Sequence, residues 1–143
     1  MVLAISRWVL ALFMITAGVL HFVVDHLFAQ IVPPFLPWAY PIVWISGVFE
    51  IALGAMLLVP KTRRLASLGL VLLFIAVFPA NIYMAVANVQ IQGLPAGRQP
   101  SEVALWFRLP LQFLLMWWAY RAGRDAQPSE PARHSEPRAA AAL

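Results

Sequence analysis

Residues 65–89 read LASLGLVLLFIAVFPANIYMAVANV, and this stretch decides the fold class. Its 25 residues include no charged side chain, and at 1.5 Å per residue a helix of this length exceeds the roughly 30 Å hydrocarbon core of a bilayer. Within lipid a segment must satisfy its own backbone hydrogen bonds, so a long apolar run is expected to be helical. Similar runs occupy residues 8–24, 41–59 and 103–120. We therefore predict an all-α membrane protein, a four-transmembrane-helix antiparallel bundle with helices at about 3–24, 41–59, 65–89 and 103–121.

The composition also favours a membrane protein. Hydrophobic residues make up 62% of the 143 residues, whereas soluble domains contain roughly 45 to 50%. Cysteine is absent, which excludes disulfides, thiolate metal sites and dithiol redox chemistry within this chain. The net charge of +4 comes from Lys and Arg residues beside the apolar runs rather than from a basic face interleaved with aromatics. We therefore expect no nucleic-acid partner.

The basic residues predict how the helices are oriented. They precede the first run, fill the loop between the second and third runs, and follow the fourth run: Arg7, Lys61, Arg63, Arg64, Arg121 and Arg124. By the positive-inside rule these three regions face the cytoplasm. The predicted localisation is therefore the cell inner (cytoplasmic) membrane, as a multi-pass protein with N- and C-termini cytoplasmic. No small-x-small cleavage site follows the first run, so this helix is expected to be retained.

The first outer loop, residues 25–40, differs from an ordinary hydrophilic connection. Bulky apolar side chains are interleaved there with three prolines, which prevent a continuous helix. Trp38 and Tyr40 suit the headgroup region of a bilayer. We predict a Pro-rich interfacial segment that caps the bundle.

The C-terminal segment has a different composition. Beyond Arg124 the residues are mainly Pro, Ala, Ser, Arg and Glu, with no apolar periodicity that could bury a face. We predict one membrane domain at residues 1–124 and a disordered cytoplasmic tail at residues 125–143.

Polar side chains inside the predicted helices point to a site. An ionisable group at membrane depth costs roughly 2.5 to 3.5 kcal/mol on insertion scales, so it calls for a partner or a function. Glu50 lies nine residues into the second run, near the midplane, while Arg108 and Gln112 share one face of the fourth helix. Pro79 loosens the backbone near Asn81 on the third helix and frees a carbonyl about one turn earlier. We predict one buried polar pocket formed by His21, Glu50, Asn81, Arg108 and Gln112.

Two interpretations of this polar set are open. It could be a structural network in which Glu50 pairs with Arg108 and fixes the register of the helices, or it could bind a ligand. His21 and His26 point to different faces of a regular helix, so we predict no metal site. No phosphate-binding loop or nucleotide motif is present, and no serine has a base in register, so catalytic residues are unassigned.

Several short motifs carry a family resemblance. They are AGVLHF at residues 17–22, VPPFLP at 32–37, SGVFE at 46–50, FPANIYMA at 78–85 and RLPLQ at 108–112. Over about residues 5–120 the chain resembles the DoxX-like family of small bacterial four-helix membrane proteins. That family is named for a membrane subunit linked to thiosulfate:quinone oxidation, and other members are described with membrane-associated oxidoreductase complexes. Its signatures correspond here to His21, Glu50, Asn81, Arg108 and Gln112.

The resemblance implies a subunit or accessory of a membrane redox system whose pocket holds a quinone-like or other small amphiphilic molecule. Because the chain has neither cysteine nor a fused soluble catalytic domain, it is expected to act as an oxidoreductase subunit rather than as a complete enzyme. Two alternatives are a non-catalytic membrane scaffold or assembly factor, and a small transporter that would need to oligomerise. The expected partners are the lipid bilayer, a membrane-associated oxidoreductase subunit and further copies of the chain.

Overall fold

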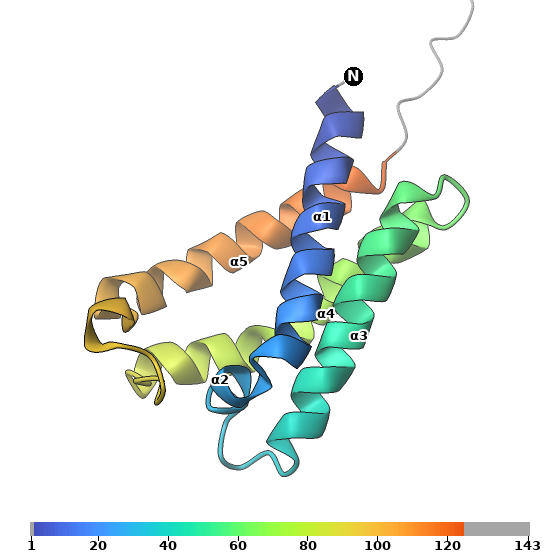
Figure 1. Ribbon diagram of the computed structural model, residues 1–143. Helices are drawn as coiled ribbons and strands as arrows, with labels where there is room; N and C mark the ends of the chain where they lie inside the picture. The colour runs from blue at the N-terminus through green and yellow to red at the C-terminus, as the bar shows by residue number, and fades with distance from the viewer. Residues whose placement is uncertain (1, 125–143) are drawn as a thin grey trace, which may run out of the picture.

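The computed structural model describes residues 2–124, and this part of the chain is helical with short connections. Figure 1 shows the helices in chain order: α1 (Val2–Val23), α2 (Asp25–Ala29), α3 (Ala39–Leu58), α4 (Arg63–Val86), the short 3₁₀ helix η1 (Ala96–Arg98) and α5 (Glu102–Ala122). Three of them, α1, α3 and α4, are long and apolar enough to cross a membrane. The prediction of an all-helical fold is therefore confirmed for the described residues, and three of the four predicted spans have the length and hydropathy of a membrane helix.

The long helices begin and end close to the predicted positions. The largest difference is at the end of α4, which was expected to continue to Val89 and instead stops at Val86. Asn88 adopts a left-handed backbone with φ of 46°, a conformation that Asn tolerates and that commonly terminates helices. The tail predicted at residues 125–143 lies outside the described residues.

The long helices form two antiparallel pairs. α1 packs along α3, α4 packs along α5, and the pairs are joined mainly through α3 and α4. In Figure 1 the two pairs meet at the end where α1 begins and α5 finishes, which we call the terminal end. They diverge toward the end that carries α2, which we call the α2 end. The main apolar core fills the space where the pairs meet, and its largest members are Leu10, Met14, Leu57, Leu70 and Phe74.

Side-chain hydrogen bonds hold the terminal end together. The last carbonyl groups of a helix lack partners within the helix, and Arg7 from α1 binds the carbonyl of the last residue of α5 and one that follows the helix. Its Nε donates to the carbonyl of Ala122 at 2.8 Å and its Nη2 to the carbonyl of Arg124 at 2.6 Å. Ser67 Oγ on α4 donates to the carbonyl of Ala119 at 2.8 Å. Both ends of the described chain are thereby fixed to the same end of the molecule.

A glycine contact sets the separation of α1 and α3. A Cβ atom on Gly18 would lie 2.6 Å from the carbonyl oxygen of Gly47, and one on Gly47 would lie 2.8 Å from His21 Cβ. No larger residue fits at either position without moving a helix backbone. The close approach brings the backbones that carry His21 and Glu50 next to each other.

The connection between α1 and α3 contains a short helix that the sequence reasoning did not include. The backbone of Val24, with φ of −129° and ψ of 42°, breaks α1, and α2 then runs from Asp25 to Ala29. The three prolines follow α2 in an irregular stretch that ends at Trp38. The prediction that no continuous helix runs through residues 25–40 is therefore confirmed, and α2 is an element that the prediction did not include.

Candidate functional site

A cavity of about 340 Å³ lies between the two helix pairs, in the half of the molecule toward α2. Residues 13–21 of α1, 28–32 in and after α2, 42–50 of α3, 74–81 of α4 and 108–115 of α5 supply its walls. The walls are mainly apolar. All five residues of the predicted polar set line this one cavity: His21, Glu50, Asn81, Arg108 and Gln112.

His21 and Glu50 face each other across the contact between α1 and α3. His21 Nδ1 lies 2.8 Å from the carbonyl oxygen of Ala17 and 3.1 Å from Glu50 Oε2. Because a carbonyl only accepts, Nδ1 carries the hydrogen and directs it to Ala17. Glu50 Oε2 is close enough for an ion pair when His21 is protonated, yet it lies outside hydrogen-bond geometry and has no hydrogen-bond partner among the described residues. We take the contact as electrostatic.

This arrangement leaves two polar atoms without a hydrogen bond to the described residues, Glu50 Oε2 and His21 Nε2. Glu50 is only 9% exposed, and a buried oxygen without a donor carries a free-energy penalty of about 1 to 3 kcal/mol. The ring of His21 stacks on Phe28 of α2 with centroids 4.1 Å apart, which fixes its plane. Its Nε2 atom has no hydrogen bond to the described residues. A ligand bearing both a donor and an acceptor could satisfy both atoms.

Asn81 and Gln112 form a second polar pair, between α4 and α5. Asn81 Nδ2 donates to Gln112 Oε1 at 2.9 Å, and Gln112 Nε2 donates to the backbone carbonyl of Phe74 at 2.8 Å. Phe74 lies one residue before Ile75, whose carbonyl loses its usual helical donor because Pro79 has no N–H. Both the oxygen and the nitrogen of the Gln112 amide are therefore hydrogen-bonded to α4. The main effect of the Asn81–Gln112 pair is to hold α4 and α5 together.

Arg108 occupies the rim of the cavity. Its Nη1 lies 2.8 Å from Met84 Sδ, and a thioether is a weak acceptor for a group with five N–H donors. No ion pair joins Arg108 to Glu50 in the described part of the chain, where Glu50 instead contacts His21. The pairing expected under the structural-network interpretation is therefore wrong. The guanidinium retains donors for a molecule in the cavity.

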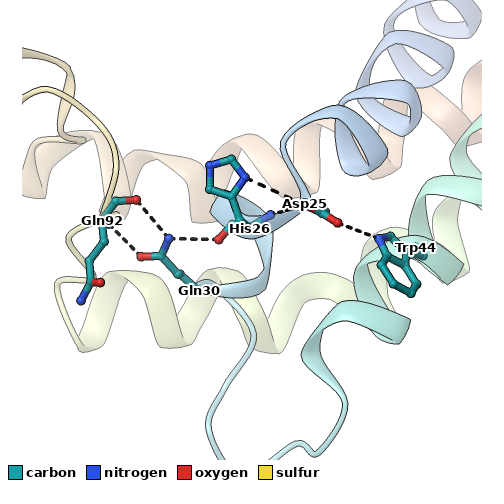
Figure 2. A network of polar contacts seen from close by, with 5 residues as sticks. All are labelled: Asp25, His26, Gln30, Trp44 and Gln92. Carbon is teal, nitrogen blue, oxygen red and sulfur yellow. Dashed lines mark hydrogen bonds and ion pairs between the residues drawn. The ribbon is translucent and has the colours of Figure 1, made fainter.

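Two sets of polar contacts hold α2 over the cavity, and Figure 2 shows both. In the first, Asp25 receives hydrogen bonds from the backbone N–H of His26 at 2.7 Å and from Trp44 Nε1 on α3 at 3.1 Å. His26 Nδ1 lies 3.9 Å from Asp25 Oδ1. The described residues contain no cluster of three His, Cys, Asp or Glu side chains that could hold a metal ion.

The second set joins α2 to the connection between α4 and α5. Gln30 Oε1 accepts from the backbone N–H of Gln92 at 2.7 Å, and its Nε2 donates to the Gln92 carbonyl at 3.1 Å. The same Nε2 also donates to the carbonyl of His26 at 3.0 Å. Sequence reasoning missed this clasp, since nothing in the two segments marks a side chain that bonds a backbone 62 residues away.

Comparison with known proteins yields one match. The sequence model of a domain of unknown function (DUF8561) matches residues 10–123, which include all the polar residues of the cavity. No curated protein and no solved structure matches the chain.

Proposed function

The chain belongs to the DUF8561 family, whose domain has no assigned function, and we propose that its cavity binds a small amphiphilic, quinone-like molecule in the membrane. In this proposal the protein is a DoxX-like subunit or accessory of a membrane redox system. A partner oxidoreductase carries out the electron transfer, and this chain holds the molecule. The motifs behind the resemblance supply residues to all five of the cavity walls, which supports the proposal.

The observation that carries the proposal is the buried Oε2 of Glu50, which has no hydrogen-bond donor among the described residues and lies beside His21, and both of these residues line an apolar cavity. A volume of about 340 Å³ is within the range of small-molecule sites, which typically have apolar walls and a few polar groups that fix orientation. A quinone-like head group fits this pattern. Arg108 would donate to a carbonyl oxygen, while His21 or Glu50 would exchange a proton with the hydroxyl form of the head group.

We also propose that α5 is a fourth membrane span, completing a four-helix bundle. Its 21 residues extend about 31 Å, enough for the hydrocarbon core. Arg108 and Gln112 make it more polar than the other long helices, but both line the cavity. The other faces of α5 expose large apolar side chains: Val103, Trp106, Phe107, Phe113, Leu114 and Trp117.

The proposed orientation places the terminal end in the cytoplasm. Basic residues gather near this end, at the start of α1, the α3–α4 loop and the end of α5: Arg7, Lys61, Arg63, Arg64, Arg121 and Arg124. With four spans the positive-inside rule then puts both termini in the cytoplasm of a bacterial inner membrane. The α2 end, with Phe35 and Trp38 about three-quarters exposed, lies at the outer interface.

The test is analysis of molecules that co-purify with the full chain in mild detergent. Lipid and quinone extracts of wild type, Glu50→Gln and Arg108→Ala are compared by mass spectrometry. We expect a near-stoichiometric amphiphile in wild type and at least a tenfold loss in both variants, because each loses a polar contact to the head group. Matched controls are Glu102→Gln and Arg98→Ala, which change exposed residues outside the cavity and should retain the molecule.

One observation favours a second candidate, a non-catalytic scaffold or assembly factor. Both the oxygen and the nitrogen of the Gln112 amide are hydrogen-bonded to α4, as expected for a residue that only fixes helix register. If no sample contains a bound molecule while Glu50→Gln lowers the stability in detergent, the scaffold function is preferred.

A further inference from the structure

The cavity has one open side, between α1 and α5. Most of the side chains that line it are buried or half-buried, and four are exposed at the molecular surface. Those four all come from these two helices: Phe13 and Leu20 on α1, and Arg108 and Leu111 on α5. The apolar members are 48%, 42% and 38% exposed, respectively. The opening is therefore bordered by three apolar side chains and one cation.

The arrangement of the helices explains this opening. α1 and α5 are joined near the terminal end, where Trp118 Nε1 donates to Ser6 Oγ at 2.7 Å. Toward the α2 end they separate, as Figure 1 shows. The residues of α1 and α5 that line the cavity, within 13–21 and 108–115, lie on the α2 side of this joined part.

The residues that line the cavity on α3, on α4 and in and after α2 are all buried or half-buried. Phe28, Ile31 and Val32 line it from the α2 end, and the Gln30–Gln92 clasp holds that segment in place. The apolar core closes the cavity toward the terminal end. The glycine contact closes the seam between α1 and α3, while the Asn81–Gln112 pair ties α4 to α5. A molecule arriving from water at the α2 end would have to displace this cover.

We infer that the gap between α1 and α5 is a lateral portal through which the ligand enters from the bilayer. This inference rests on the proposed function and deepens it by naming the ligand class: a membrane-resident amphiphile with one polar head and a long hydrocarbon or isoprenoid chain. The head lies at His21 and Glu50, and the chain passes between Phe13, Leu20 and Leu111 into the lipid. A compact water-soluble substrate does not need such an opening.

Site-directed spin labelling tests where the portal leads, without any ligand. The chain has no cysteine, so Leu20→Cys and Leu111→Cys each carry a single nitroxide in the full chain in liposomes. Leu72→Cys, at a 66% exposed position of α4, is the lipid-facing control. Gly97→Cys, in η1 with open space around the position, is the aqueous control. Relaxation enhancement is measured with oxygen, which partitions into lipid, and with a water-soluble nickel chelate.

We expect the two portal labels to respond to oxygen like the Leu72 label, with little response to the nickel chelate. A nickel response equal to that of the Gly97 label would mean an aqueous entrance and would overturn the inference. Weak responses to both reagents would also overturn it, because they would mean that a second copy or another protein covers the gap.

Binding of decylubiquinone, compared with the same head group without its chain, tests the ligand class. Decylubiquinone should immobilise the nitroxides at positions 20 and 111 but not at 72. Leu111→Phe, which narrows the portal, should weaken decylubiquinone binding at least tenfold more than binding of the chainless analogue, as measured by titration calorimetry. Equal losses for the two probes would refute the role of the portal. Failure of the wild type to bind either probe would instead count against the proposed function. The relaxation data would still show whether the gap between α1 and α5 opens to lipid or to water.

Discussion

Replacing Gly18 by alanine should destabilise the protein even though alanine is the better helix former. The added Cβ would lie 2.6 Å from the carbonyl oxygen of Gly47, 2.7 Å from Ile51 Cγ1 and 3.0 Å from Glu50 Cβ. Ordinary contacts begin near 3.4 Å, so the first of these distances is short by about 0.8 Å. The Ile51 side chain can rotate, but the carbonyl of Gly47 moves only with its helix.

Two opposing free energies set the size of the effect. Alanine gains up to about 1 kcal/mol over glycine in a helix interior, whereas overpacking a tight interface costs about 1 to 3 kcal/mol. Because the clash at Gly18 includes a backbone atom, we expect a penalty near the upper end of that range. The free energy of unfolding should therefore fall by about 1 to 2 kcal/mol. The bound amphiphile should also be lost, since the moved helix carries Glu50 away from His21.

The assay is unfolding of purified protein in mixed detergent and SDS micelles, followed by far-ultraviolet circular dichroism. Gly54→Ala is a graded comparison, because its Cβ would lie 3.0 Å from the carbonyl oxygen of Ala11. Gly97→Ala is the neutral control, with no atom within 4 Å of the new Cβ. The stability should increase in the order Gly18→Ala, Gly54→Ala, Gly97→Ala. A Gly18→Ala protein as stable as wild type would refute the claim that this contact sets the helix separation.

Two further substitutions test hydrogen bonds between segments. Gln112→Leu should lower the free energy of unfolding by about 1 to 2 kcal/mol, because it removes the bond to Asn81 and a buried bond to a backbone carbonyl. The control Gln90→Leu, at an exposed glutamine, should leave the stability unchanged in the same SDS titration. Gln30→Ala should raise the amide hydrogen-exchange rate of Gln92 at least tenfold with little change in global stability, since only the clasp over the cavity is lost; an unchanged rate would mean that the clasp does not hold the cover closed.

The helices of this protein were largely predictable because bilayer physics acts on each segment separately. A run such as residues 65–89 carries its own length and hydropathy, and lipid leaves no alternative to a helix. α2 escaped prediction because five residues from Asp25 to Ala29 form a single turn that depends on contacts elsewhere. Its N-terminal Asp25 is held by Trp44, which lies on another helix. Contacts between two segments cannot be predicted from the sequence of either segment alone.

The same distinction applies to the site. Depth along a helix identified the five cavity residues, because an ionisable or amide group inside a membrane is rare enough to stand out. Their pairing was not predictable from depth. Arg108 and His21 lie at similar depths and either could have paired with Glu50. The glycine contact between α1 and α3 brings His21 next to Glu50. The opening between α1 and α5 had no sequence signal, since it depends on how two helix pairs diverge.

The distribution of hydrogen bonds bears on whether the polar set is only structural. A polar network that only fixes the register of the helices is most stabilising when its members satisfy one another's hydrogen bonds. Asn81 and Gln112 form such a bond. Glu50 and Arg108 could have formed the strongest such bond, yet one has an oxygen without a donor and the other donates to a thioether. Incompletely partnered ionisable groups at membrane depth cost roughly 2.5 to 3.5 kcal/mol each, a penalty that helix packing alone does not require. A ligand that bridges the two groups across the cavity would offset that penalty, which is why we place the function in the cavity and not in the helix surfaces.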